Sequence, residues 1–319
     1  MLQRNAMTFS QSVKSEILKT VKNIKGCNAT SFLTAVLKSV GSLSLGFKGF
    51  AFTVESDNPE FLDLCKKLAN SNLGVDATIE TYNVNAKGFP VYSCKFDGSI
   101  GEKLGLTKRD SSGVLELCDD VSLLLPKDDG AKRAFLQGLF VACGSVVIPL
   151  NEDVEAETAD RAKYHLELRF ADTTFAHAVN ALYPQIPFRT VSRKNSIVLY
   201  QKDSEKIADF LVYVNAMVAK LKLENVIAVR EARNLANRRS NCTYANIDKA
   251  VAAAQRQLDA IELLRQQGAF DGLPDNLKEI ALLREKYPES TLDEIADMLH
   301  ISKSGANHRF TKLIELSNR

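Results

Sequence analysis

An apolar helix that ends at a glycine and continues into a strand occurs twice in this sequence, and this internal repeat restricts the fold. The helical spacing of residues 29–40 stops at Gly41, and that of residues 130–143 stops at Gly144. In both copies a serine and an apolar segment follow the glycine, which is a residue that readily ends a helix. The chain is therefore predicted to contain two copies of one supersecondary unit.

The elements around the two copies have the same order. Helical spacing is found at residues 12–24, 29–40, 59–69, 101–106, 130–143, 173–182 and 204–214, and strand-like spacing at 43–47, 50–54, 77–82, 90–96, 164–170, 191–193 and 196–200. These patterns predict an αββαββα unit in residues 8–110 and again in residues 128–225. An acidic insert in the second copy (Glu152, Asp153, Glu155, Glu157 and Asp160) is predicted to be a solvated loop.

The chain then changes character and ends in a helical module. Residues 226–274 predict a basic helical linker, interrupted by a polar stretch near Ser240 and closed by helix-breaking residues 268–274. Helices are predicted over residues 275–287, 292–299 and 303–317, with a capping box at Thr291 and Glu294 and with Ser302 as the last cap. The short turn before Ser302 is typical of a helix-turn-helix. His300 stands in this turn, where glycine is usual because φ is often positive.

The last helix carries side chains suited to double-stranded DNA. The N-terminus of the second helix of such a motif enters the major groove, where Asn307 can pair with adenine and Arg309 with guanine. Lys303 and the amide of Ser302 can hold a phosphate at the positive end of the helix. The predicted DNA-binding residues of the motif (275–312) are Ser302, Lys303, Ser304, Asn307, His308, Arg309 and Lys312. A small helical protein-binding bundle is the alternative interpretation.

The predicted linker is also basic. Arginine and lysine in this segment suit phosphate contacts, and the residues concerned are Arg230, Arg233, Arg238, Arg239 and Lys249. A solvated helix that only joins domains explains the same pattern, so both interpretations stay open.

Two motifs point to known families. The helices 33–41 and 136–144 resemble the LAGLIDADG helices of homing endonucleases, in which an acidic residue before the final glycine holds a divalent metal. Val40 and Cys143 stand at those positions here. A hard cation needs oxygen ligands, so the resemblance implies no catalytic residue, no metal and no nuclease activity. The saddle-shaped LAGLIDADG-like domain itself is expected to be retained. The opening of the second C-terminal helix, residues 291–296, is also similar to region four of bacterial sigma factors.

These helices, together with residues 237–249 and the ending 301–309, resemble the WhiA family over nearly the whole chain. The resemblance implies an α+β fold: a two-repeat LAGLIDADG-like αββαββα saddle in residues 1–225, a linker in 226–274 and an all-α helix-turn-helix domain in 275–319. It also implies a DNA-binding transcription regulator of cell division and chromosome segregation, or of sporulation in some lineages, with protein partners such as the transcription machinery. A protein- or ligand-binding scaffold that uses the saddle is the alternative.

Composition excludes several other classes of protein. The formal net charge of +2 is too small for an argument from overall charge, so any DNA site must be local. No stretch approaches the ~20 apolar residues of a membrane span, and Lys14, Glu16 and Lys19 interrupt any signal peptide. We therefore expect a cytoplasmic, nucleoid-associated protein without cofactors. The six cysteines are dispersed and are predicted to be reduced, buried thiols.

Overall fold

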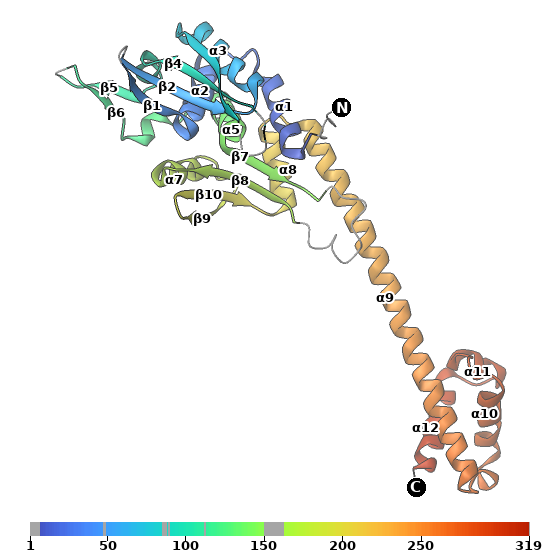
Figure 1. The fold of residues 1–319 in the computed structure, drawn as a ribbon. Helices are drawn as coiled ribbons and strands as arrows, with labels where there is room; N and C mark the ends of the chain where they lie inside the picture. The colour runs from blue at the N-terminus through green and yellow to red at the C-terminus, as the bar shows by residue number, and fades with distance from the viewer. Residues whose placement is uncertain are drawn as a thin grey trace. The chain divides into compact units, whose positions relative to one another are not determined.

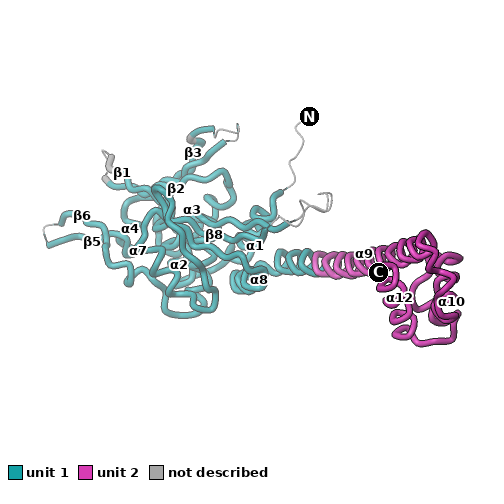
Figure 2. The backbone as a smooth tube through the Cα atoms, turned by 90° about the horizontal axis from the view of Figure 1, so that it is seen from below, with its two compact units in different colours: residues 1–228 teal, residues 229–319 magenta. Residues whose placement is uncertain are grey.

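The chain forms two compact units in a computed structural model, residues 1–228 and residues 229–319 (Figure 2). The structure describes residues 7–46, 49–84, 88, 90–111, 113–149 and 163–318. The acidic insert predicted between Glu152 and Asp160 lies outside the described residues. Each unit has a hydrophobic core of its own.

The first unit contains the predicted αββαββα repeat twice, which confirms the fold class (Figure 1). Helix α1 (Phe9–Val21), capped by Thr8, precedes both copies. The first copy consists of α2 (Gly26–Val40), β1 (Ser42–Gly46), β2 (Gly49–Ser56), α3 (Pro59–Leu73), β3 (Ala77–Val84), β4 (Pro90–Asp97) and α4 (Ser99–Lys103). The second consists of α5 (Asp129–Cys143), β7 (Gly144–Val147), β8 (His165–Phe170), α7 (Thr173–Leu182), β9 (Arg189–Arg193), β10 (Ser196–Gln201) and α8 (Ser204–Tyr213).

A short hairpin between the copies was not predicted. It is formed by β5 (Thr107–Arg109) and β6 (Leu115–Leu117), and a 3-10 turn η1 (Val121–Leu124) follows it. Strands of three residues are too short to show an alternating pattern in the sequence.

Each copy contributes one antiparallel four-stranded sheet, and the two sheets share one topology. The strand orders are β1-β2-β4-β3 and β7-β8-β10-β9. One face of each sheet packs on the core: in β4, Cys94 and Phe96 are buried whereas Lys95 between them is exposed. The opposite face of each sheet is consequently the one that can meet solvent or a partner.

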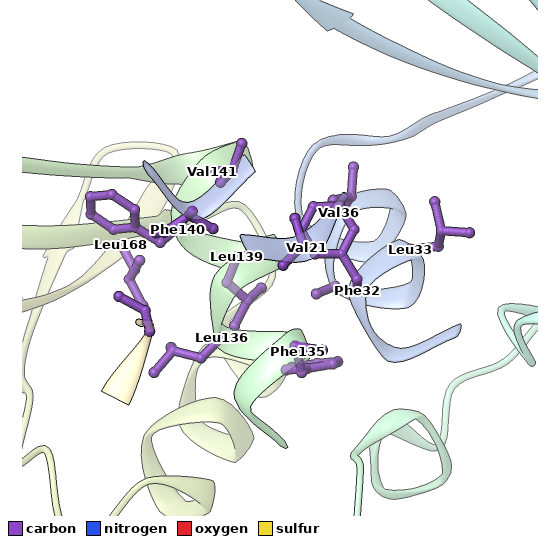
Figure 3. Packing of buried hydrophobic residues seen from close by; sticks show 14 of the residues in the cluster. Val21, Phe32, Leu33, Val36, Phe135, Leu136, Leu139, Phe140, Val141 and Leu168 are labelled. Carbon is purple, nitrogen blue, oxygen red and sulfur yellow. The ribbon is translucent and has the colours of Figure 1, made fainter. Parts of the chain in front are cut away.

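Helices α2 and α5 pack closely against each other at the centre of the first unit. Figure 3 shows Phe32 and Val36 of α2 in one cluster with Phe135 and Leu139 of α5. Gly138 permits the close approach, since a Cβ there would lie 2.6 Å from the carbonyl oxygen of Phe32. The pairing of the two glycine-ended helices therefore depends on a position without a side chain.

The second unit is built on the C-terminal part of α9 (Met217–Gln266). After α9 come η2 (Phe270–Gly272), α10 (Asp275–Lys286), α11 (Leu292–Met298) and α12 (Lys303–Ser317). The predicted interruption near Ser240 is wrong, because residues 217–266 contain neither glycine nor proline and polar residues alone do not end a helix.

The core of the second unit also reaches into the segment predicted as linker. Ile261, Leu264, Phe270 and Leu273 are buried with residues of α10, α11 and α12. Residues 261–273 therefore belong to the folded C-terminal module. They were predicted as linker because Gly268, Gly272 and Pro274 break the helical pattern.

Arg284 lies inside this core with an exposed fraction of 2 %. Its Nε donates to Oε1 of Gln257 at 2.9 Å, and its Nη1 donates to the backbone oxygen of Ser290 at 2.6 Å. The guanidinium carbon lies 5.3 Å from the ring centroid of Phe310. Burial lowers the pKa of this guanidinium below its usual value. Through the contacts above, Arg284 connects α9, the loop before α11 and α12.

The turn before α12 has the backbone that the motif requires. His300 adopts a φ of +53°, the left-handed conformation for which glycine is usual. Thr291 and Glu294 form the predicted capping box, and Ser302 caps α12. The three predicted helices of the module are thus confirmed.

The cysteines differ in environment. Cys65 and Cys94 are buried, which raises the pKa of the Cys94 thiol to about 12, and all six cysteines are free. Cys27 and Cys242 are exposed, so the prediction that all six thiols are buried was wrong for these two. Among the described residues, we find no helix with the length and apolar character that crossing a membrane requires.

Replacing Gly138 with alanine is expected to lower the free energy of unfolding of the first unit by about 1–3 kcal/mol. Alanine alone would favour the helix by about 1 kcal/mol, but the new Cβ would meet the backbone of α2, which cannot move aside cheaply. Scanning calorimetry of the full chain measures the effect. Gly130→Ala in the same helix is the control, since its nearest neighbour is the Asn28 side chain at 3.1 Å. Equal losses in both variants would contradict this account.

Replacing Arg284 with methionine is expected to lower the free energy of unfolding of the second unit by about 1.5–3 kcal/mol, because Gln257 and the carbonyl of Ser290 would lose a charged donor. Scanning calorimetry of the full chain measures this loss in the unfolding transition of the second unit. Arg256→Met, on an exposed position of α9, is expected to leave that transition unchanged. An unchanged transition in the Arg284 variant would show that the guanidinium does not hold the module together.

Candidate nucleic-acid interface

The outward face of α12 is fixed by the residues that the helix buries. Ala306, Phe310 and Leu313 are spaced by four and three residues and lie in the core of the second unit. The opposite side of the helix is exposed, and its residues are Lys303, Ser304, Asn307, His308, Thr311 and Lys312. Most of the residues predicted from the sequence therefore lie together on one solvent-facing surface.

The N-terminus of α12 is open to a ligand. The hydroxyl of Ser302 accepts a hydrogen bond from the amide of Gly305 at 3.1 Å, which satisfies one donor of the first turn. The amides of Lys303 and Ser304 belong to the same first turn, where no helical acceptor precedes them. This helix end is consequently positive and suits an anionic group such as a phosphate.

Lys303 has an acidic neighbour on the preceding helix. Its Nζ lies 2.6 Å from Oδ2 of Asp293, and both side chains are largely exposed. An exposed ion pair of this kind contributes at most about 1 kcal/mol, so a phosphate can replace the carboxylate at little cost. Asp293 therefore holds Lys303 near the helix end without fixing it.

Arg309 was predicted among the DNA-facing residues of α12, but its side chain lies against α10. Its side chain is 22 % exposed, its Nη1 donates to the backbone oxygen of Asn276 at 3.3 Å, and the carboxylate of Glu279 is 3.8 Å away. The arginine is therefore directed along α10, away from the outward face. Helical phase explains the difference, because Arg309 is adjacent to the buried Phe310 and lies at the edge of the packed side.

Thr311 belongs to the outward face and was missed. It follows Asn307 by one helical turn, and its hydroxyl donates to the carbonyl oxygen of Asn307 at 2.9 Å. The spacing of Ser304, Asn307 and Thr311 was visible in the sequence as an i, i+3, i+7 series. Thr311 nevertheless stood outside the predicted set, which included the serines at 302 and 304 but not this threonine.

The basic residues of α9 do not share one face. Residues 231–252 are all exposed, and Arg238 and Lys249 are about three turns apart, which brings them to the same side. Arg256 extends this line by about two further turns. Arg233 precedes Arg238 by about one and a half turns and so lies on the other side. The structure therefore offers one basic face, formed by Arg238, Lys249 and Arg256.

The positions that resemble the metal-binding positions of homing endonucleases lie at the ends of α2 and α5. Val40 has no donor atom, and desolvation raises the pKa of the Cys143 thiol to about 11, so its sulfur stays protonated. The ammonium of Lys14 lies 6.0 Å from the ring centroid of Phe140 in the same region. In the part of the chain that the structure describes, no group of three or more His, Cys, Asp or Glu side chains is placed to hold a metal.

Two family models match the chain. The model described as the WhiA C-terminal HTH domain matches residues 236–317, and that of the WhiA LAGLIDADG-like domain matches residues 29–89 and 132–233. A crystal structure of full-length WhiA from Thermotoga maritima has a TM-score of 0.57 at 21 % identity and covers 98 % of each chain, which supports the fold.

Curated relatives align over almost the whole length. A "probable cell division protein WhiA" of Clostridium acetobutylicum is 32 % identical, with 98 % of each chain covered. One of Staphylococcus carnosus with the same name is 33 % identical and covers 98 % of this chain and 97 % of its own. Since both domain models match and these relatives align from end to end, the chain belongs to the WhiA family.

Proposed function

We propose that this chain is a DNA-binding regulatory protein that reads duplex DNA with α12. The observation that carries the proposal is the capped, positive N-terminus of α12 beside an exposed polar face. Helix-turn-helix proteins place this end of their second helix in the major groove. Ser302 and Lys303 would hold a phosphate, and Ser304, Asn307, His308 and Thr311 would face the base edges.

Arg309 and Lys312 have supporting roles in this proposal. Arg309 contacts the start of α10 and so sets the angle between α10 and α12. Lys312 is exposed on the next turn, where its ammonium, 3.3 Å from Glu315, can turn to a phosphate. Arg238 and Lys249 of α9 would add phosphate contacts, as would Arg256. No contact with a base or a phosphate is proposed for Arg230, Arg233 or Arg239.

The family supports a proposal for the cellular role. Relatives are named as probable cell division proteins, and a helix-turn-helix suits a transcription regulator. We therefore propose regulation of genes for cell division and chromosome segregation, and for sporulation in lineages that sporulate. Such a protein would act at the nucleoid in the cytoplasm, with the transcription machinery as a protein partner.

No nuclease activity is proposed for the first unit. Cleavage by two metals requires hard oxygen ligands at the ends of the paired helices. Val40 and a protonated Cys143 supply none, and Lys14 adds a positive charge close to Cys143. The chemistry of these side chains therefore favours a regulator over an endonuclease.

Asn307→Ala is expected to weaken binding to a cognate duplex by about 1–3 kcal/mol, because the bidentate contact with adenine is lost. Binding to random duplex of the same length should change far less. Fluorescence anisotropy with sites recovered by chromatin mapping measures both affinities. Arg309→Ala is the comparison, since a residue that positions α12 should weaken both duplexes alike. A selective loss in the Arg309 variant would reverse the two roles.

The basic face of α9 predicts a salt effect. Replacing both Arg238 and Lys249 with alanine should make the negative log–log slope of affinity against salt shallower by about 0.9 per lost phosphate contact. Arg233→Ala is the matched control on the other side of the same helix and should leave the slope as it was. A slope that stays constant in the double variant would remove α9 from the interface.

A further inference from the structure

The middle of α9 contributes no residue to either hydrophobic core, yet it carries large apolar side chains. Residues 231–252 are all exposed, over a length of about six helical turns. Five large apolar residues between positions 229 and 251 are 50–65 % exposed, and they are Val229, Leu235, Tyr244, Ile247 and Val251. Single exposed apolar residues are ordinary on a protein surface, whereas a continuous row of them indicates a contact surface.

Helical phase places four of these five residues on one side of α9. Tyr244, Ile247 and Val251 follow one another by three and four residues, which is the spacing of one helix face. Val229 precedes Ile247 by about five full turns and so returns to the same side. Leu235 lies about a third of a turn away from it. Val229, Tyr244, Ile247 and Val251 are called the apolar stripe below.

The apolar stripe has the spacing of a coiled coil. Steps of four and three residues alternate along this side of the helix, and the positions reached are Ser240, Tyr244, Ile247, Val251, Ala254 and Leu258. This alternation averages 3.5 residues per turn, which lets two helices wind around each other with one seam in contact. A helix that only joined two units would not need apolar residues in phase over this length. The pattern therefore favours a second helix as the occupant.

The basic face of α9 lies opposite the apolar stripe. Arg238 precedes Ile247 by about two and a half turns, and Arg256 follows it by the same amount. Lys249 is two residues after Ile247, which is a little more than half a turn. A helix packed on the apolar stripe consequently leaves the basic face uncovered, so the two surfaces can be occupied independently.

The charges beside the stripe complement one another when the helix is reversed. Arg230 and Arg233 stand toward its N-terminal end, whereas Asp259 and Glu262 are exposed toward its C-terminal end. All four lie on the same flank of the stripe, and a two-fold axis perpendicular to two antiparallel helices brings equal flanks together. With position 246 of both helices at one level, Arg233 meets Asp259 of the second copy. Arg230 then meets Glu262 of the second copy.

The same register fits the residues at the centre of the stripe. Ile247 lies next to the two-fold axis and contacts Ile247 of the second copy. Tyr244 is level with Asp248 of the second copy, so its hydroxyl can donate to that carboxylate. Val251 is level with Ser240 and Tyr244 of the second copy. A parallel pair would instead set Arg233 beside Arg233, where the like charges repel.

We propose that the apolar stripe of α9 is the contact surface for a second copy of this chain, with the two α9 helices antiparallel. A two-fold contact needs a surface that complements itself, and the stripe and its flanking charges meet this requirement. Alanine and serine alternate with the large residues, so the helices approach closely but bury little apolar area. The dimer is therefore expected at micromolar rather than nanomolar concentrations of the chain.

Sedimentation equilibrium of the full chain tests the surface. Ile247→Glu should raise the dissociation constant of the dimer at least about tenfold, because a carboxylate would be buried at the centre of the contact. Leu235→Glu is the matched control, since Leu235 is 50 % and Ile247 is 52 % exposed and neither belongs to a core. A chain that stays monomeric up to about 100 µM, or equal effects of the two variants, would overturn the proposal.

Cysteine crosslinking tests the orientation of the two helices. The exposed Cys27 and Cys242 are first replaced by serine. Ile247→Cys is then expected to form a disulfide-linked dimer under mild oxidation. Val229→Cys is not, because the antiparallel register separates the two copies of this position by about 50 Å. Dimers from both variants would show a parallel pair, and no dimer from Ile247→Cys would show no pairing at this surface. Either result would overturn the proposal.

A charge exchange tests the register. Arg233→Asp and Asp259→Arg should each weaken the dimer about fivefold, since two symmetric pairs turn from attraction to repulsion. The variant with both changes should recover most of the loss. Failure to recover would overturn this register.

The dimer and the function proposed for α12 fail separately. At chain concentrations below those of dimer formation, Ile247→Glu should leave the affinity for a single cognate site unchanged, whereas Asn307→Ala should leave the sedimentation behaviour unchanged.

Discussion

The buried guanidinium of Arg284 is the interaction on which the candidate interface depends. It joins Gln257 of α9, the carbonyl of Ser290 before α11 and the ring of Phe310 in α12. A desolvated cation is costly unless its donors are satisfied, so these partners must keep their places for the module to fold. Because Phe310 faces Arg284, the outward side of α12 is set by the core beneath it.

In the first unit, the constraint is the close packing of the two repeated helices and of the sheets that follow them. Two glycine-ended helices meet at Gly138, and each carries one sheet whose inner face is committed to the core. Exposed positions of the outer faces, Glu55 and Arg169 among them, contribute little to the core, so the two copies could differ there while their registers stayed the same. This freedom explains how Glu55 and Arg169 can occupy equivalent positions without a change of fold, each two residues after the partner of the serine that follows a helix-ending glycine.

Much of this arrangement could be predicted from the sequence, and the exceptions have physical reasons. Caps such as Thr291 and Ser302 act through local hydrogen bonds, so their signals are complete within a few residues. The strands β5 and β6 were missed because three residues are too few to show an alternating pattern. Arg309 was assigned to the outward face because residue type suggests exposure, whereas helical phase against α10 decides it. The equivalence of Glu55 and Arg169 needed the strand registers, which the sequence alone does not provide.

The net charge of +2 is small because positive and negative side chains are nearly equal in number, but they lie on different surfaces. Positive side chains gather on α12 and on one side of α9. Carboxylates occupy α11, where Asp293 lies, and the sheet β1-β2-β4-β3, where Glu55 and Glu80 lie. A chain with this pattern gains little attraction to DNA at distances beyond the Debye length of about 8 Å, but at contact its cationic faces favour the backbone and its acidic faces oppose it. The charges therefore act more on the orientation of the bound protein than on its capture, because surfaces of the wrong sign penalise the alternative poses.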